Sequence, residues 1–363
     1  MKIAALLLIC LPLAAQFDDI AAKAAKARDA DQLDQAVSLY RQAVHLHPAW
    51  AEGWWYLGTI AYDRQRFAEA AACLNKVAAL APKDAKAFAM LGLSETQLKQ
   101  NRAALNHLER ALALDVGDEN NMRQVVLFTQ ATLLISEGAF GRAQDALDKL
   151  SIERPSADEE LRLALGRAVI GILPSDAALA LETRDLLMTA GQAEFLDANR
   201  KTAEATQAYA DLAKRFPKTH NVQFAYGRFL LKNHLDEQAV AAFKREIENN
   251  PQHLLARLGI AGGLLSTEPA TGLPYAEQAV QLAPKLEEAH YLYGACLLEA
   301  EQTTHAITEL ETARRLNPKD ERVYFRLAKA YAITHRETDA AEARETFRQL
   351  RQASGDEPKK NEQ

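Results

Sequence analysis

The sequence predicts an all-α fold in which antiparallel helix pairs stack into a solenoid, and three observations support this. Prolines that follow helical stretches recur every 33 or 34 residues within two parts of the chain. Small side chains stand at two fixed distances before these prolines. Alanine is abundant, whereas the β-branched and aromatic residues that favour strands are comparatively scarce. A repeat array grows lengthwise, so the 363 residues need not divide into several globular domains.

The prolines mark the end of each repeat. Six of them form the series: Pro48, Pro82, Pro217, Pro251, Pro284 and Pro318. Val116 occupies the place of a proline 34 residues after Pro82, and Pro155 continues the series after a few extra residues. Because proline lacks an N–H group and clashes with the preceding turn, each proline is expected to end the second helix of a pair.

Small residues recur in register with the prolines. One class lies twelve residues before each repeat end: Ala36, Ala70, Ala104, Ala143, Ala205, Ala239, Ala306 and Ala340. A second class lies twelve residues further upstream: Ala24, Gly58, Gly92, Ala131, Ala193, Gly227, Gly294 and Ala328. Larger side chains there would push two helices beyond their packing distance of about 8–10 Å. These positions therefore predict where the two helices of each pair cross.

With this register, the sequence resembles the tetratricopeptide repeat family. One unit matches the family pattern nearly residue for residue, through Trp54, Leu57, Gly58, Ala70, Leu74 and Pro82. The resemblance covers roughly residues 17–157 and 186–348. It implies a right-handed superhelical solenoid of about nine recognisable repeats plus one degenerate repeat. The loop glycine common in the family is present as Gly138 and is replaced elsewhere, for example by Gln65, His234 and His335.

The predicted organisation has five parts. Residues 1–15 form a signal peptide, residues 16–157 an N-terminal array of about four repeats, and residues 186–348 a C-terminal array of about five. Residues 158–185 match the repeat pattern poorly and are expected to be a degenerate repeat or junction. Residues 349–363 are expected to form a tail with a disordered end, because that end is polar and holds glycine and proline.

The first fifteen residues have the layout of a secretory signal peptide. Lys2 gives a positive start, an apolar run extends to Leu13, and small residues end at Ala15. The apolar run is shorter than the roughly 20 residues that span a bilayer. We therefore expect an exported protein, periplasmic or secreted, with no integral membrane segment in the mature chain. Ile9, rather than a small residue, precedes Cys10, which argues against lipid anchoring at Cys10.

Charge and motifs exclude several function classes. The chain carries 43 basic and 49 acidic residues, a formal net charge of −6, and the two signs are interspersed. A nucleic-acid partner would need a concentrated basic face, so none is expected. The sequence has no phosphate-binding glycine loop, nucleophile elbow or closed set of metal ligands. We therefore expect no catalytic residues, no cofactor, no metal site and no enzyme activity.

The resemblance implies that function lies on the first helices of the pairs, which in the family line a concave surface that holds a peptide or a partner's helix. The predicted partner-binding residues face outward from these helices: Trp55, Asn221, Phe224, Arg228, Tyr291, Phe325 and Lys329. Aromatic and arginine side chains are favoured at the centres of interfaces. The same rings could instead pack against the neighbouring helix and complete the core, and the sequence leaves both possibilities open.

The predicted function is a non-catalytic scaffold that binds a protein or peptide partner, and the resemblance suggests a role in envelope assembly or secretion. Two alternatives remain open at the level of sequence. One is a structural element that associates with a second copy and gives a homo-oligomer. The other is an accessory subunit of an enzyme complex that acts on cell-wall polymer or polysaccharide.

Overall fold

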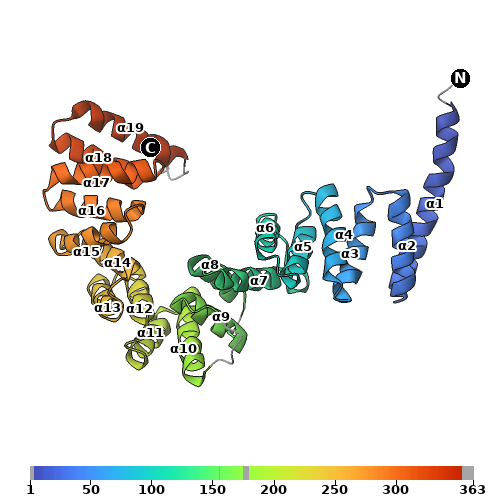
Figure 1. Ribbon diagram of the computed structural model, residues 1–363, viewed down its shortest axis with the longest axis horizontal. Coiled ribbons are helices and arrows are strands. Elements are labelled where there is room, and N and C mark those ends of the chain that lie inside the picture. The colour runs from blue at the N-terminus through green and yellow to red at the C-terminus, as the bar shows by residue number, and fades with distance from the viewer. Residues whose placement is uncertain (1–3, 155, 175–179, 354–363) are drawn as a thin grey trace, which may run out of the picture. The chain divides into compact units, whose positions relative to one another are not determined.

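The computed structural model describes residues 4–154, 156–174 and 180–353 (Figure 1). Within these ranges the chain contains nineteen α-helices, one short 3₁₀ helix and no strand. The chain divides into two compact units, Met1–Ala178 (unit 1) and Leu179–Gln363 (unit 2). This composition of the described chain confirms the predicted all-α fold.

Unit 1 contains four helix pairs and one further helix. Each pair packs two consecutive helices side by side, and the ninth helix packs on the fourth pair. The helices are α1 Ala4–Asp29, α2 Leu33–Leu46, α3 Ala51–Asp63, α4 Phe67–Leu80, α5 Ala85–Gln97, α6 Asn101–Ala113, α7 Met122–Ser136, α8 Phe140–Glu153 and α9 Glu159–Ile170, with the 3₁₀ helix Glu119–Asn121 before α7.

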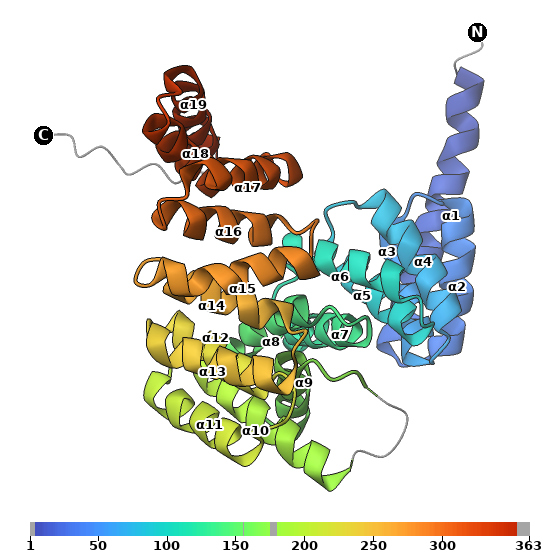
Figure 2. The same ribbon diagram turned by 60° about the vertical axis from the view of Figure 1, so that its left-hand side comes forward.

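Unit 2 contains five helix pairs. Figure 2 shows the last three pairs lying side by side, and an apolar core from Leu258 to Ala343 runs through them. The helices are α10 Leu181–Ala198, α11 Thr202–Arg215, α12 Val222–Lys232, α13 Asp236–Asn249, α14 Leu254–Leu264, α15 Pro269–Leu282, α16 Glu287–Glu299, α17 Thr303–Leu316, α18 Glu321–Ile333 and α19 Glu337–Ala353.

The nine helix pairs of the described chain confirm the predicted count of about nine repeats, and α9 is the additional, incomplete one. The predicted junction, residues 158–185, contains α9 and the first turn of α10. The predicted tail contains the last residues of α19, up to Ala353, and its remainder lies outside the described residues. Residues 1–3 of the predicted signal peptide also lie outside them, so the five boundaries stay predictions.

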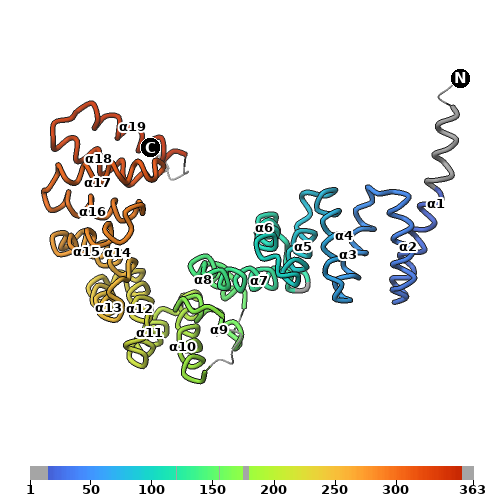
Figure 3. Tube along the Cα trace, in the orientation of Figure 1, coloured from blue at the N-terminus to red at the C-terminus, as the bar shows by residue number. Residues whose placement is uncertain are grey.

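Short turns join the two helices of a pair, as the chain trace in Figure 3 shows, and in most repeats one residue of this turn has a positive φ. In the first turn of this kind, Asp31 N–H donates to Arg28 O at 2.9 Å and Gln32 N–H donates to Ala27 O at 2.8 Å. This pair of hydrogen bonds is the Schellman motif, which needs a left-handed residue after the helix. Gly138 takes that position with φ +74°, and Gln65, His234 and His335 take it with φ between +57° and +59°. The family's loop glycine is thus replaced by residues that adopt the glycine conformation.

Glycines in the first helices allow the two helices of a pair to cross closely. A Cβ atom on Gly58 would lie 2.7 Å from Leu74 Cγ, and one on Gly227 would lie 2.6 Å from Phe243 Cδ1. Ordinary carbon–carbon contacts are about 3.5–4.0 Å. These distances confirm the predicted crossing positions at Gly58 and Gly227.

Four repeats share a hydrogen bond that the sequence pattern does not reveal. In each, the side chain six residues after the repeat proline donates to that proline's carbonyl oxygen, which lies just beyond a helix end and has few other partners. The bonds are Trp54 Nε1 to Pro48 O at 2.9 Å, Arg257 Nη2 to Pro251 O at 2.7 Å, His290 Nε2 to Pro284 O at 3.1 Å and Tyr324 Oη to Pro318 O at 3.0 Å. Four chemically different donors therefore fix the start of the next first helix in the same place.

Candidate protein-interaction site

The predicted partner-binding residues lie on first helices in both units. Trp55 is a half-buried residue of α3 in unit 1, whereas the other six belong to unit 2. Asn221, Phe224 and Arg228 lie together at and along α12, Tyr291 lies on α16, and Phe325 and Lys329 lie on α18. Their role in binding stays a prediction, and their surroundings differ from one helix to the next.

Asn221 and Phe224 are held by a buried carboxylate from the partner helix of their own pair. Glu246 of α13 is fully buried, and its two carboxylate oxygens accept from Asn221 N–H at 2.8 Å and Phe224 N–H at 3.1 Å. A carboxylate is favourable there because it satisfies free N–H groups at the positive end of α12.

The next repeat also contacts these two residues, through His253. The His253 ring centroid is 4.7 Å from that of Phe224. Its Nδ1 accepts from Ala256 N–H at 3.1 Å, so the Nε2–H donates to Asn221 Oδ1, which is 2.9 Å away. Burial lowers the pKa of His253, which is consistent with a neutral ring. Asn221 and Phe224 therefore contribute to packing between repeats, and the exposed Arg228 lies with its guanidinium carbon 6.0 Å from the Phe224 ring centroid.

Tyr291 is covered by the repeat after its own. Its side chain is 8% exposed, and the guanidinium carbon of Arg322 on α18 lies 4.5 Å from the ring centroid. A cation over an aromatic face is attracted by the ring quadrupole. The ring is therefore part of the contact between the fourth and fifth pairs of unit 2.

Phe325 and Lys329 lie on the surface of the last pair. Phe325 is 54% exposed, and the Lys329 ammonium is 3.1 and 3.0 Å from the two carboxylate oxygens of Glu299 on α16. Burial alone would raise the pKa of Glu299, but the hydrogen bonds and charges of Lys329 and Arg326 outweigh it and lower that pKa. Glu299 is thus an ionised link between the last two first helices.

Phe325 forms one wall of a cleft between α18 and α19, which we call the α18–α19 cleft. The cleft has a volume of about 590 Å³ and is lined by Phe325, Ala328, Lys329, Ala332, Ile333, Arg344, Phe347 and Arg348. The Phe325 and Phe347 ring centroids are 5.7 Å apart. Every charged residue that lines the cleft is basic. An apolar centre with a charged rim is the usual arrangement of a protein interface.

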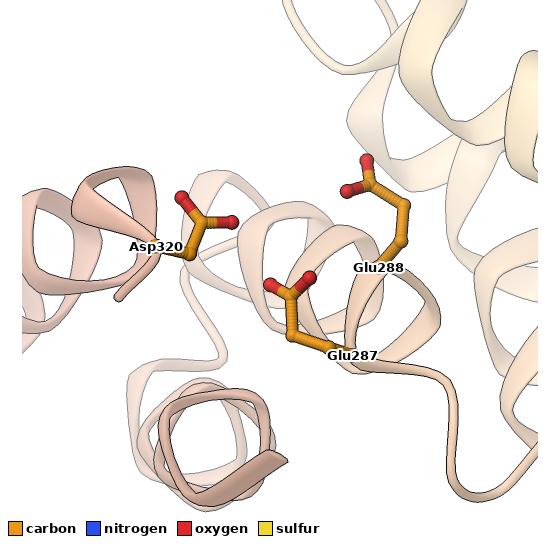
Figure 4. A group of neighbouring side chains, drawn as sticks. All are labelled: Glu287, Glu288 and Asp320. Carbon is orange, nitrogen blue, oxygen red and sulfur yellow. The ribbon is translucent and has the colours of Figure 1, made fainter. Parts of the chain in front are cut away.

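An acidic cluster between α16 and α18 is a separate candidate for a metal site (Figure 4). Carboxylate oxygens of Glu287, Glu288 and Asp320 lie within 4.8 Å of one another. Arg322 already supplies positive charge here, with Nη2 2.6 Å from Glu288 Oε2 and 2.7 Å from Asp320 Oδ2. Burial, together with a hydrogen bond to Asp320, raises the pKa of Glu287 to about 7. The cluster is best described as an ion-pair network that joins two repeats.

Sequence reasoning predicted Phe325 and Lys329 but missed the wall that α19 provides. Arg344 and Phe347 stand 34 residues after Leu310 and Ala313, both of which are fully buried in α17. A cation and a large ring thus replace residues that are buried one repeat earlier. This change of residue type in the last described repeat could have predicted from the sequence that α19 lines the cleft.

Family models agree with the repeat geometry. One tetratricopeptide repeat model matches residues 22–85 and 191–253, and a second matches residues 264–332. Together these matches span more than half of the chain, in both units. The chain belongs to the tetratricopeptide repeat family. In this tetratricopeptide repeat protein no helix of the described residues is long and apolar enough to cross a membrane.

Several solved structures are similar to parts of this tetratricopeptide repeat protein. The "MamA RS-1 ArsTM double mutant" is 19% identical over 50% of this chain and 100% of its own, with a TM-score of 0.45. MamA "41-end" from Desulfovibrio magneticus RS-1 is 20% identical over 48% and 98%, with a TM-score of 0.44. YrrB, described as "a TPR protein with an unusual peptide-binding site", is 16% identical over 48% and 93%, with a TM-score of 0.41. No curated protein matches the sequence.

Proposed function

We propose that this chain is a non-catalytic scaffold that binds a segment of a partner protein on the first helices of unit 2, with the α18–α19 cleft as the principal contact. The observation that carries the proposal is the exposure of Phe325 at the wall of a cleft whose charged residues are all basic. Membership of a family built from stacked helix pairs supports a role in protein interaction, because such stacking creates extended binding surfaces.

The cleft is the best candidate because the other predicted anchors in unit 2 already contact this chain. Tyr291 is covered by Arg322, and Phe224 contacts Phe243 and His253. Phe325 also contacts a ring of this chain, Phe347, but unlike Tyr291 it remains more than half exposed, so a partner could contact it without displacing that packing. Aromatic and arginine side chains are enriched at the centres of protein interfaces, where a partner buries them.

Site-specific photocrosslinking tests the proposal. A photoreactive phenylalanine is placed at Phe325 and, as a control, at Leu316, an exposed residue at the end of the second helix α17. We expect one discrete adduct with a partner protein from position 325 and none from position 316. An adduct only from position 316 would move the site to the second helices, and no adduct from either position would refute the proposal.

We further propose that the protein is exported and acts in envelope assembly or secretion, which rests on the signal-like layout of residues 1–15. Expression in a bacterial host with these residues intact should give an extracytoplasmic protein whose first residue is Gln16. A variant with Leu6, Leu7 and Leu8 each replaced by Asp should stay in the cytoplasm. Recovery of the unchanged chain with its own Met1, still in the cytoplasm, would refute export.

A further inference from the structure

Equivalent residues of successive first helices differ sharply in exposure. The fifth residues of α14, α16 and α18 are Leu258, Tyr291 and Phe325. Leu258 and Tyr291 are each 8% exposed, whereas Phe325 is 54% exposed. The difference arises from position, because α18 covers Tyr291 and no described helix comes after α19 to cover Phe325. Phe325 therefore belongs to an inter-repeat face whose next helix pair is not part of the described chain.

A second position along α18 shows the same relationship. Ile333, the last residue of α18, is 52% exposed. Its equivalent in α16 is Glu299, which bonds Lys329 and Arg326 of the next first helix. The place that binds the next first helix through charge in α16 is thus apolar and uncovered in α18.

The centre of the cleft is more apolar than is usual for a surface that only faces water. Terminal repeats of an array that end in solvent carry a polar outer face. Here Phe325, Ile333 and Phe347 instead form an apolar centre. No helix of the described residues follows α19 and packs over this centre. An apolar group that packed on it would remove the centre from water.

The shape of the cleft favours a helix as that group. In the preceding repeats this face is occupied by the next first helix, a segment of 13 residues in α16 and in α18. Phe325, Lys329 and Ile333 are four residues apart and form a line along α18, and Phe347 of α19 contacts the Phe325 ring, so the two rings form one apolar surface. An amphipathic helix inserts its apolar stripe into a groove of this kind.

The charged residues of the cleft indicate which side chains would be favoured along the edges of that helix. Lys329, Arg344 and Arg348 are the charged residues that line it, and Arg351 lies with its guanidinium carbon 5.7 Å from the Phe347 ring centroid. Lys329 already bonds Glu299, and Arg348 Nη2 lies 2.9 Å from Glu345 Oε2, so carboxylates of this chain partly balance the basic rim. Opposite charges across an interface favour association and register, and like charges oppose both. Asp and Glu side chains at the edges of the helix would therefore be favoured over Lys and Arg.

We propose that the α18–α19 cleft binds an amphipathic helix of a partner protein, with an apolar stripe and acidic edges, in the place where a further first helix of the array would lie. The proposal rests on the proposed function and deepens it, because it names the kind of partner segment that the cleft recognises. It differs from binding of an extended peptide along the first helices.

Designed peptides test the proposal with the full chain. The probe is a fluorescent 20-residue helical peptide with Leu at i, i+3, i+4 and i+7 and Glu along both edges. One control peptide replaces every Glu by Lys, and another carries a central Pro that breaks the helix. By fluorescence anisotropy we expect a Kd on the order of 1–10 μM for the Glu peptide, and about tenfold or more weaker binding for both controls.

Variants of the protein locate the bound peptide. Phe325→Ala and Ile333→Glu should each weaken binding of the Glu peptide about tenfold or more, because both remove an apolar contact from the cleft. Leu255→Ala is the matched control, since Leu255 is a similarly exposed apolar residue on α14, outside the cleft. All three positions are exposed, and circular dichroism checks that each variant remains folded.

Four results would overturn the proposal. They are equal binding of the Pro peptide, equal binding of the Lys peptide, an equal loss with Leu255→Ala, and self-association of the chain that Phe325→Ala abolishes, which would make a second copy the occupant. If the photocrosslink from position 325 persists while these peptides fail, the scaffold function stands and the helical partner does not. If both fail, the proposed function fails as well.

Discussion

The Phe243 ring lies between two glycines, and this arrangement gives the sharpest prediction for stability. A Cβ atom on Gly227 of α12 would lie 2.6 Å from Phe243 Cδ1, and one on Gly259 of α14 would lie 2.6 Å from Cε2 on the other side of the ring. Phe243 is 1% exposed. Because a helix backbone lies close to each of the two edges of the ring, a new methyl group on one side would push the ring against the other helix.

Gly227→Ala should therefore lower the stability of unit 2. The substitution gains about 1 kcal/mol of helix propensity but forces an overlap of about 1 Å against a ring that cannot move, at the upper end of the roughly 1–3 kcal/mol cost of overpacking. The expected net loss is about 2 kcal/mol, or a fall in Tm of about 4–8 °C for a unit of this size. The exposed Gly262 has nothing closer than 4.0 Å, so Gly262→Ala should instead gain about 0.5–1 kcal/mol.

A double-mutant cycle identifies the cause of the loss. Phe243→Ala removes the whole ring that lies against positions 227 and 259, so a methyl group at position 227 no longer meets it. The cost of Gly227→Ala should then fall by about 1 kcal/mol or more. The assay is thermal and urea unfolding followed by circular dichroism, with hydrogen exchange of α12 and α13 amides as a local readout. Equal stability changes for Gly227→Ala and Gly262→Ala would refute the reasoning.

Three further predictions concern single residues of unit 2. His234→Gly should raise stability by about 1 kcal/mol, because His234 has a φ of +59° that glycine adopts at lower cost; an unchanged urea midpoint would contradict it. Glu287→Gln should flatten the pH dependence of Tm between about pH 5 and pH 8. Burial and a hydrogen bond with Asp320 raise the pKa of Glu287 to about 7, so the stability that its protonated form contributes is complete below about pH 4.5 and is lost as the pH rises through 7. A variant whose Tm has the same slope with pH as that of the parent would exclude Glu287 as the cause. Glu246→Ala should cost about 1–3 kcal/mol, because it leaves two half-buried N–H groups at the start of α12 without their acceptor; faster hydrogen exchange confined to other helices would argue against that role.

The repeat register could be predicted from the sequence because it depends on local rules. Proline tends to end a helix, and a small residue is needed where two helices cross closely. Pro48 therefore predicts a helix end and Gly58 a crossing point without knowledge of the rest of the fold. The resemblance to the family, aligned by the same spacing, placed His234 and His335 where the family has its loop glycine, and both residues adopt a positive φ.

The candidate site was less accessible to sequence reasoning because the exposure of a first-helix residue depends on whether another repeat packs over it. Tyr291 and Phe325 stand at the same position and are both aromatic, yet one is covered and the other is not. Asn221 looked available for a partner, but Glu246 and His253, 25 and 32 residues away, occupy its hydrogen-bonding groups. Neither contact obeys a local pattern, so neither could be deduced from periodicity.

The relation between packing and binding in this chain explains why a site would arise at the end of an array. The first helix α16 presents a face that contacts the next first helix, through Tyr291 and Glu299. No described helix follows α19 and packs over the corresponding face of α18. Under the proposal above, Ile333 and Arg344 would make this face prefer an acidic, apolar helix over a copy of its own repeat. Replacing Ile333 by Glu and Arg344 by Leu should therefore restore the internal pattern and weaken binding of the Glu peptide, while the fold of the preceding pairs stays unchanged.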